Sequence, residues 1–399
     1  MIERRHVFYI GGFDPRGPIF TYQNCADETA KWSRLAGYPV RVSERGGSDD
    51  AADIWTVESD IEGVRITTTF HCLRWDDIVR RNWEKNSWRV AFHALRLALP
   101  VYRSGVFNRA QRESWPFTVT MATAALPAAL VVGCVVLLLL TLAIAVLSPT
   151  LSRGAVSLLP FAGAAWLAWW GSRNISRFSP DWTGRTGIFM WRLATGPRDE
   201  RFHERLDIMA DYVAMVVERE KPEEAQIIGH SLGTILAALV AARLLRRGPE
   251  PGAPGQCATL ITLGQLCSFV RDVSAAQWFR DELAIFARFP DFQWLDFSSP
   301  PDGACYALVN TLDFLPSLPE NLPRLLNAQF HKTFSAERMA AARERRIDMH
   351  FLYLKSPDYP QVDTDLYDYV ALLAGPVAAA QRFGGRASGT AFFRRGESA

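Results

Sequence analysis

The chain has 399 residues, 49% of them hydrophobic, and its formal net charge at pH 7 is only +2. This length fits one large domain or two ordinary ones. A charge near zero, without basic patches interleaved with aromatic residues, argues against nucleic acid as a partner. The six cysteines are scattered, with no CxxC pair and no His/Cys cluster. We therefore expect no metal site, no disulfide framework and a reducing compartment.

The N-terminal segment is predicted to form the first part of a sheet. A strand is expected at His6–Ile10, followed directly by the glycine-rich loop Gly11-Gly12-Phe13. No apolar signal-peptide core precedes it. Further elements follow from composition and alternation: a helix over residues 21–36, strands at 38–43, 54–59 and 64–72, and a Trp-rich, charged helical stretch from 75 to 112.

Two uncharged stretches, Phe117–Leu147 and Gly154–Gly171, come next. A run of 18 or more apolar residues is a candidate membrane span. Lys and Arg are frequent before the first stretch and after the second, and only Arg153 lies between them. By the positive-inside rule, both flanks then face the cytoplasm. The sequence predicts a two-span hairpin at residues 113–175, in a membrane of the bacterial inner-membrane type.

The second half alternates strands with helices, which favours a mostly parallel sheet flanked by helices. The predicted strands are at 189–193, 225–228, 258–263 and 292–297, and the predicted helices are at 199–220, 234–247, 275–289 and 336–346. Residues 248–255 are expected to form a Gly/Pro-rich loop. Residues 381–399 are rich in Arg, Gly and Ser and are expected to be a disordered tail.

The pentapeptide Gly229-His230-Ser231-Leu232-Gly233 stands between one predicted strand and one predicted helix. G-x-S-x-G in this context is typical of a nucleophile elbow, a sharp turn that exposes a serine hydroxyl above the sheet. The helix N-terminus that follows favours developing negative charge. Ser231 is therefore the candidate nucleophile, and a structural glycine turn is the alternative.

A serine needs a base to take its proton and an acid to orient that base. On sheets with this elbow, the chain order is Ser, then Asp or Glu, then His. Only His331 and His350 follow Ser231 beyond its neighbour His230, whose side chain is expected to point to the opposite face. We favour His350 as the base and keep His331 as the alternate.

Asp302 is the favoured acid, because it stands in the loop after a late strand, where ligands and catalytic groups collect in open α/β sheets. Asp296, within that strand, is the alternate, and Asp313 remains a further possibility. A turn aspartate in Pro-Asp-Gly can also simply cap local N–H groups. The oxyanion hole is expected from the N–H of Leu232 and a second N–H from Gly12 or Phe13.

These residues resemble the α/β-hydrolase superfamily, particularly its lipase and esterase branch. The resemblance covers residues 6–75 and about 185–375, and the inserted hairpin departs from the family pattern. It implies ester hydrolysis through an acyl-serine intermediate, with no metal or organic cofactor. Acyl transfer by the same triad and a catalytically inactive membrane scaffold are the alternatives. Lipid or another acyl ester is the expected substrate, the bilayer is the expected partner, and protein partners stay undefined.

The expected organisation follows from these segments. Residues 1–112 and 176–380 are predicted to form the two parts of one α/β-hydrolase-like domain, 113–175 the hairpin, and 381–399 the tail. The first part would hold the oxyanion strand and loop. The second would hold the elbow, the acid and the base.

Overall fold

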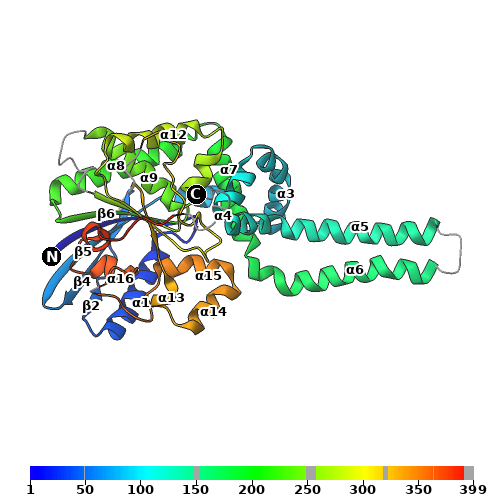
Figure 1. Ribbon diagram of the computed structural model, residues 1–399, viewed down its shortest axis with the longest axis horizontal. Coiled ribbons are helices and arrows are strands. Elements are labelled where there is room, and N and C mark those ends of the chain that lie inside the picture. Colours follow the sequence, from blue (N-terminus) through cyan, green and yellow to red (C-terminus); the bar gives the residue numbers. More distant parts are fainter. Residues whose placement is uncertain (49, 148–152, 249–257, 318–321, 363, 391–399) are drawn as a thin grey trace, which may run out of the picture.

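A computed structural model shows one mixed sheet with helices on both faces (Figure 1). The described residues are 1–48, 50–147, 153–248, 258–317, 322–362 and 364–390. In these ranges the strands are β1 (Arg4–Ile10), β2 (Val40–Val42), β3 (Gly46–Ser48), β4 (Ala52–Ile61), β5 (Val64–Leu73), β6 (Glu224–His230), β7 (Ala258–Leu263), β8 (Trp294–Ser298) and β9 (Arg324–Asn327).

The strand order is β2-β4-β5-β1-β6-β7-β8-β9, and β3 pairs with β4. β4 runs antiparallel to β2, β3 and β5, whereas the pairs from β5 to β9 are parallel. The expected mostly parallel sheet is therefore present, with an antiparallel edge made by the N-terminal hairpin. Strands β3 and β9 were not expected from the sequence.

The middle of the sheet joins distant parts of the chain. β1 pairs with β6, so that Ile10 lies opposite Gly229. The buried Arg5 guanidinium lies 2.5 Å from the Glu224 carboxylate of the neighbouring strand. It also donates to the backbone oxygens of Leu373 and Gly375. This contact ties the first strand, the sixth strand and the C-terminal region together.

Successive side chains of each strand point to opposite faces of the sheet, so they pack into two hydrophobic cores, one on each face. Phe8 and Ile227 belong to one core, and Val7 and Ile228 to the other. The helices of the first core are α2 (Asp76–Asn82), α4 (Val106–Ala122), α7 (Pro180–Thr195), α8 (Glu200–Glu220), α9 (Gly233–Arg247), α11 (Cys267–Asp272), α12 (Gln277–Leu283) and η3 (Ala284–Arg288). Those of the second are α1 (Pro18–Ala36), α13 (Phe330–Thr333), α14 (Ala336–Glu344), α15 (Arg346–Phe351), η4 (Leu352–Leu354), α16 (Tyr369–Ala374) and α17 (Ala379–Phe383).

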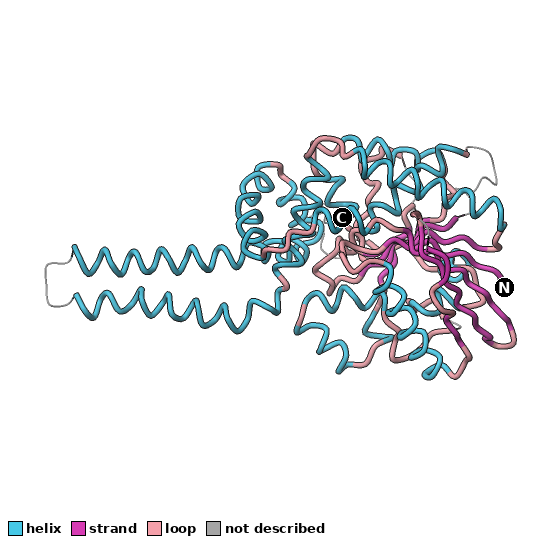
Figure 2. Tube along the Cα trace, turned by 180° about the vertical axis from the view of Figure 1, so that it is seen from behind, coloured by secondary structure: helices cyan, strands magenta, loops and turns pink. Residues whose placement is uncertain are grey.

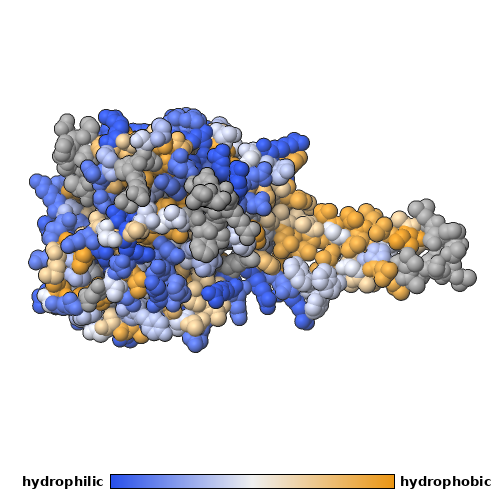
Figure 3. Space-filling view, viewed as in Figure 1, coloured by the Kyte–Doolittle hydropathy of each residue, from blue (hydrophilic) through white to orange (hydrophobic). Residues whose placement is uncertain are grey.

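A helical hairpin projects from one end of this domain (Figures 1 and 2). It consists of α5 (Leu126–Leu147) and α6 (Arg153–Asn174), which run side by side, and its surface is largely hydrophobic (Figure 3). The elements at its base are α3 (Ser87–Arg103), η1 (Thr123–Ala125) and η2 (Ile175–Phe178). Among the described residues, one helical segment, Val106–Val146, is long and apolar enough to cross a membrane. It covers α4, η1 and nearly all of α5, and it is kinked at Ser114, where φ is −152° and ψ is 76°.

Three sequence-based expectations differ from the structure. Residues 189–193, expected as a strand, lie inside helix α7, where their apolar side chains pack on the core. The uncharged stretch that starts at Phe117 does not project from its first residue, because Phe117 is buried in the domain core and the projecting helix begins at Leu126. The expected tail begins inside helix α17, which ends at the fully buried Phe383, and beyond it the Gly389 N–H donates to the Leu325 carbonyl oxygen at 2.7 Å.

Other expectations fall on residues that the structure does not describe. These are the connector at 148–152, most of the loop at 248–255, and residues 391–399 of the expected tail.

Candidate active site

Ser231 occupies a strained turn between β6 and α9. Its φ is 57°, a left-handed conformation that non-glycine residues seldom adopt outside special sites. The flanking glycines permit the turn: a Cβ at Gly229 would lie 2.7 Å from the Gly233 carbonyl oxygen, and one at Gly233 would lie 2.2 Å from that of Ile10. The Thr234 hydroxyl braces the turn by donating to the Ser231 carbonyl oxygen at 2.6 Å.

The loop after β1 closes over the serine. A Cβ at Gly12 would lie 3.0 Å from the Ser231 Cβ and 3.4 Å from its Oγ, so only a glycine fits here without displacing a neighbour. Phe13 is buried beside it. Gly12 of this loop and Leu232, the residue that precedes α9, therefore both lie next to Ser231. An oxyanion hole needs two N–H donors at such a position, and the assignment of Leu232 and of Gly12 or Phe13 stays a prediction.

Asp302 and His350 meet next to this turn. His350 lies in α15, and its Nδ1 is 2.7 Å from the Asp302 Oδ2. Neither side chain is exposed. Burial alone would raise the pKa of Asp302, but the charge and hydrogen bond of His350, helped by the Ala304 N–H, hold that pKa below its ordinary value. Asp302 is thus an ionised carboxylate that accepts from Nδ1–H, which leaves Nε2 of His350 without a proton in the neutral ring.

Two polar atoms of this arrangement, Ser231 Oγ and His350 Nε2, make no hydrogen bond with any described residue. Both are buried, and neither has a hydrogen-bond partner within the described part of the chain, so they do not bond each other in this structure. Hydrogen bonds between a nucleophile and its base are often long without substrate and shorten when substrate binds. The missing hydrogen bond therefore does not contradict the prediction of Ser231 as nucleophile and His350 as base, which stays a prediction.

His230 is a site residue that sequence reasoning missed. Its side chain was expected to point away from Ser231, but it lines the same cleft, and its ring lies 5.0 Å from the ring of His350. Its Nε2 lies 3.1 Å from the His350 carbonyl oxygen and donates to it. Burial lowers the pKa of His230 to about 3, so the ring is neutral, and its hydrogen bond holds the backbone of His350. The signal in the sequence that could have indicated a role for His230 is its position directly before Ser231.

Helix α7 covers the site from the side of the projecting hairpin. Trp182, on its first turn, lies 5.7 Å from the His350 ring, and Phe189 stacks on Phe13 at 4.8 Å. Trp182, Gly12, His230 and Ser231 all line one cleft. No signal in the sequence pointed to Trp182, because a tryptophan close to an apolar stretch equally indicates a membrane interface.

The alternate residues lie elsewhere. His331 is exposed on α13, unlike the buried Ser231. Asp296 lies inside β8 and accepts from the Thr262 hydroxyl at 2.6 Å. Burial raises the pKa of Asp296 to about 7. Asp313 forms an ion pair with Arg271 at 2.7 Å. Of the candidate acids and bases, only Asp302 and His350 are joined by a hydrogen bond.

Within the described ranges, no group of three or more His, Cys, Asp or Glu side chains is arranged to hold a metal ion. The cysteines Cys25, Cys72, Cys134, Cys267 and Cys305 are free thiols. Burial raises the pKa of Cys267 to about 12, so its thiol stays protonated. The arrangement around Ser231 therefore offers hydroxyl, imidazole and carboxylate chemistry.

Comparison with protein families gives one match. Residues 159–256 match the model of the Thioesterase domain, a family of the α/β-hydrolase type. The matched segment begins within α6, contains the Ser231 turn and the whole of α9, and does not include Gly12, Asp302 or His350. No curated protein and no solved structure matched the chain. This match suggests an enzyme that hydrolyses or transfers acyl groups.

Proposed function

We propose that the protein is a membrane-anchored serine hydrolase that cleaves an acyl ester, or the related thioester, through an acyl-serine intermediate. One observation carries the proposal: a buried, hydrogen-bonded Asp302–His350 pair lies beside a serine in a strained turn. The loop after β1 packs against this serine through Gly12, where a Cβ would crowd it. The match of residues 159–256 to the Thioesterase domain supports the same reaction class.

In the proposed reaction, His350 Nε2 takes the proton of Ser231 as Oγ attacks the acyl carbonyl carbon. Asp302 holds Nδ1–H, which fixes the ring's tautomer and stabilises the imidazolium that forms. His350 then gives the proton to the departing alcohol or thiol as the acyl-serine forms. Water, deprotonated by His350, attacks the acyl-serine and releases the acid. The carbonyl oxygen becomes negative in both tetrahedral states, where the N–H of Leu232 and that of Gly12 or Phe13 stabilise it.

The anchor is the hairpin of α5 and α6. The helical segment Val106–Val146 meets the length and apolarity of a span, and Val135, Leu139 and Leu142 in its α5 part are between 49% and 61% exposed. Such a surface in water would be unusually apolar for a soluble monomer. Since both ends of the hairpin join one domain, a hairpin that crosses the bilayer crosses it twice. The arginine-rich flanks then favour a cytoplasmic active site.

Covalent labelling with a fluorophosphonate probe and turnover of acyl esters and thioesters by the full chain in lipid vesicles test the catalytic proposal. The wild type should be labelled, and Ser231→Ala should lose both labelling and turnover. Ser268→Ala, which removes another buried serine hydroxyl, should keep both. Equal labelling and turnover of wild type and Ser231→Ala would contradict the proposal.

Product analysis separates hydrolysis from its alternatives. Release of free acid indicates hydrolysis, whereas a new ester or amide formed with an added alcohol or amine indicates acyl transfer by the same residues. A chain that is neither labelled nor active on any acyl donor, yet stays bound to vesicles, would be a scaffold instead.

A further inference from the structure

Helix α3 presents a row of large apolar side chains to solvent. Trp88, Phe92, Leu95, Leu99 and Tyr102 are between 37% and 60% exposed. Their spacing of four and three residues places them on one face, within about 80° of arc at 100° per residue. The Asn86 side chain caps the helix by accepting from the N–H groups of Trp88 and Arg89. We call these five residues the α3 stripe.

The other side of α3 is already occupied. Val90 is buried against α7, where a Cβ at Gly184 would lie 2.4 Å from it. Leu97 and Val101 line an apolar cavity that they share with residues of α4 and α7. The helix therefore has two apolar faces, one packed inside the domain and one uncovered.

The charges of α3 are of one sign. Its sequence contains Arg89, Arg96 and Arg103 and no Asp or Glu. These arginines recur every seven residues, so they form a column along one edge of the α3 stripe. Arg89 also lies 4.0 Å from Glu84, just before the helix. An aromatic-rich apolar face bordered by arginines is the pattern of a helix that lies in a membrane interface.

The α3 stripe begins at the base of the projecting hairpin. Trp88 lines one groove with Leu130 and Val131 of α5 and Leu167 of α6. Figure 1 shows α3 beside the end of α5 at which the hairpin leaves the domain. The apolar surface of the hairpin thus continues onto α3 at the level where a bilayer surface would lie if the hairpin spans it.

We propose that α3 lies on a bilayer surface that contains anionic phospholipid, with the α3 stripe at the boundary of the acyl chains and its arginine column among the headgroups. The proposal rests on the membrane anchoring proposed above and adds a second contact with the bilayer. Because α3 packs on α7, which carries Trp182 and Phe189, this contact holds the cover of the Ser231 cleft next to the lipid.

A coiled coil with a second copy is the competing occupant, since the same four-three spacing makes a coiled-coil seam. Three observations favour lipid. The helix has 17 residues, which is short of the three to four heptads that a coiled coil sustains. Pro100 lies within it, and it has no acidic side chains to pair with its arginines across such a seam.

The experiment uses the full chain in vesicles of phosphatidylcholine, with and without phosphatidylglycerol. A lipid-soluble diazirine probe is photolysed in the bilayer, and labelled residues are mapped by mass spectrometry. We expect labels on the α3 stripe and on α5. Ile19 and Leu35 of α1 and Met215 of α8 are exposed to a similar degree and serve as controls that should stay unlabelled.

Two variants sharpen the result. Phe92→Glu with Leu99→Glu should remove the labels from α3 and leave those on α5. Arg96→Gln should reduce α3 labelling by up to about fivefold in vesicles with phosphatidylglycerol, and little in phosphatidylcholine alone, because each arginine contributes electrostatically near an anionic surface. Arg34→Gln on α1 is the matched control for lost charge and should change nothing.

The outcomes separate the two proposals. If α5 is labelled and α3 is not, or if copies of α3 crosslink to each other, the interfacial role of α3 is wrong and the anchor stands. If neither helix is labelled, membrane anchoring is wrong and the role of α3 falls with it.

Discussion

Asp302 accepts a hydrogen bond from Nδ1 of His350 at 2.7 Å, and both side chains are wholly buried. Asparagine at position 302 would keep the shape but present an amide that can hold the opposite tautomer of the ring. We expect Asp302→Asn to lower kcat by a factor on the order of 10⁴, with little change in KM. Steady-state kinetics on a soluble acyl ester, together with thermal unfolding to confirm folding, measure this effect.

Asp296→Asn is the matched control for that variant. Asp296 is as buried as Asp302 but bonds to Thr262 rather than to His350. Its replacement should leave kcat within a few-fold of the wild type. An equal loss of kcat in both variants would contradict the assignment of Asp302.

Gly11 and Gly12 provide a second pair of matched variants. A Cβ at Gly12 would press on Ser231 at 3.0 Å, whereas the nearest atom to a Cβ at Gly11 is on Tyr9, at an ordinary 3.6 Å. Gly12→Ala should therefore lower kcat by about 10²-fold or more, in the range seen when an oxyanion donor is lost. Gly11→Ala should keep most activity. Similar kinetics of the two variants would rule out a role for the loop at Ser231.

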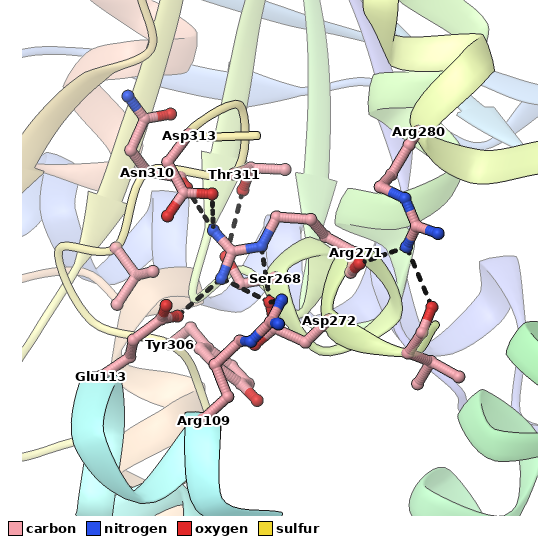
Figure 4. A network of polar contacts seen from close by, with 12 residues as sticks. Arg109, Glu113, Ser268, Arg271, Asp272, Arg280, Tyr306, Asn310, Thr311 and Asp313 are labelled. Carbon is pink, nitrogen blue, oxygen red and sulfur yellow. Dashed lines mark hydrogen bonds and ion pairs between the residues drawn. The ribbon is translucent and has the colours of Figure 1, made fainter. Parts of the chain in front are cut away.

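Arg271 is the centre of a buried ionic cluster that joins α4 to the domain core (Figure 4). Its guanidinium is 2% exposed and contacts the carboxylates of Glu113, Asp272 and Asp313 at 2.6 to 2.7 Å. Burial raises the pKa of Asp272 to about 6 despite these contacts. Arg271→Met would leave buried carboxylates without their cation, so we expect a loss of about 3–5 kcal/mol in the free energy of unfolding.

The control for this cluster is Arg109→Met. Arg109 is 52% exposed and lies 3.5 Å from Asp272, so solvent screens its contribution. Its replacement should cost no more than about 1 kcal/mol. Denaturant titration of both variants in detergent gives the two free energies, and equal values would mean that the cluster does not hold α4 in place.

Asp296 makes stability depend on pH. Burial raises its pKa from 3.8 to about 7, so between these values the folded state keeps a proton that the unfolded state has lost. Its contribution to stability is therefore full at acidic pH and is lost as pH rises from about 4 to about 7. Asp296→Asn does not titrate and should gain stability relative to the wild type across this window. Unfolding midpoints at pH 5 and pH 8 measure the difference, and a pH-independent difference would contradict the shift.

The sequence indicated much of the central fold, because strong local signals lie at its middle. The strand before Ser231 and the helix after it stand out by their apolar runs. Strands β4 and β5 lie where alternation predicted them, and β1, β7 and β8 where composition did. Few histidines follow Ser231, so chain order reduced the candidate bases to His331 and His350, and the sequence context of His350 favoured it over His331. The catalytic roles of Ser231, His350 and Asp302 stay predictions until the variants above are measured.

What the sequence could not indicate depends on tertiary contacts. The run Ile188-Phe189-Met190-Trp191 is apolar and would suit either a strand or a buried helix. In the structure it is helical because it lies within the longer helix α7. Phe117 is equally hydrophobic in a lipid-facing span and in the domain core, where it lies 4.6 Å from Tyr306. His230 and Trp182 reach the cleft only through the packing of β6, α7 and α15.

The pairing of β1 with β6 has a consequence for how the chain is made. During synthesis, the strands β1 to β5 emerge first, and β1 offers one edge without a partner until β6 has been translated. By then α5 and α6 have already been synthesised, so these apolar helices must reach their final environment before β1 and β6 can pair. Exposed strand edges invite wrong pairing, and long-range pairings form slowly. The nascent N-terminal strands therefore depend on timely placement of α5 and α6, and a delay at that step would leave β1 open to aggregation.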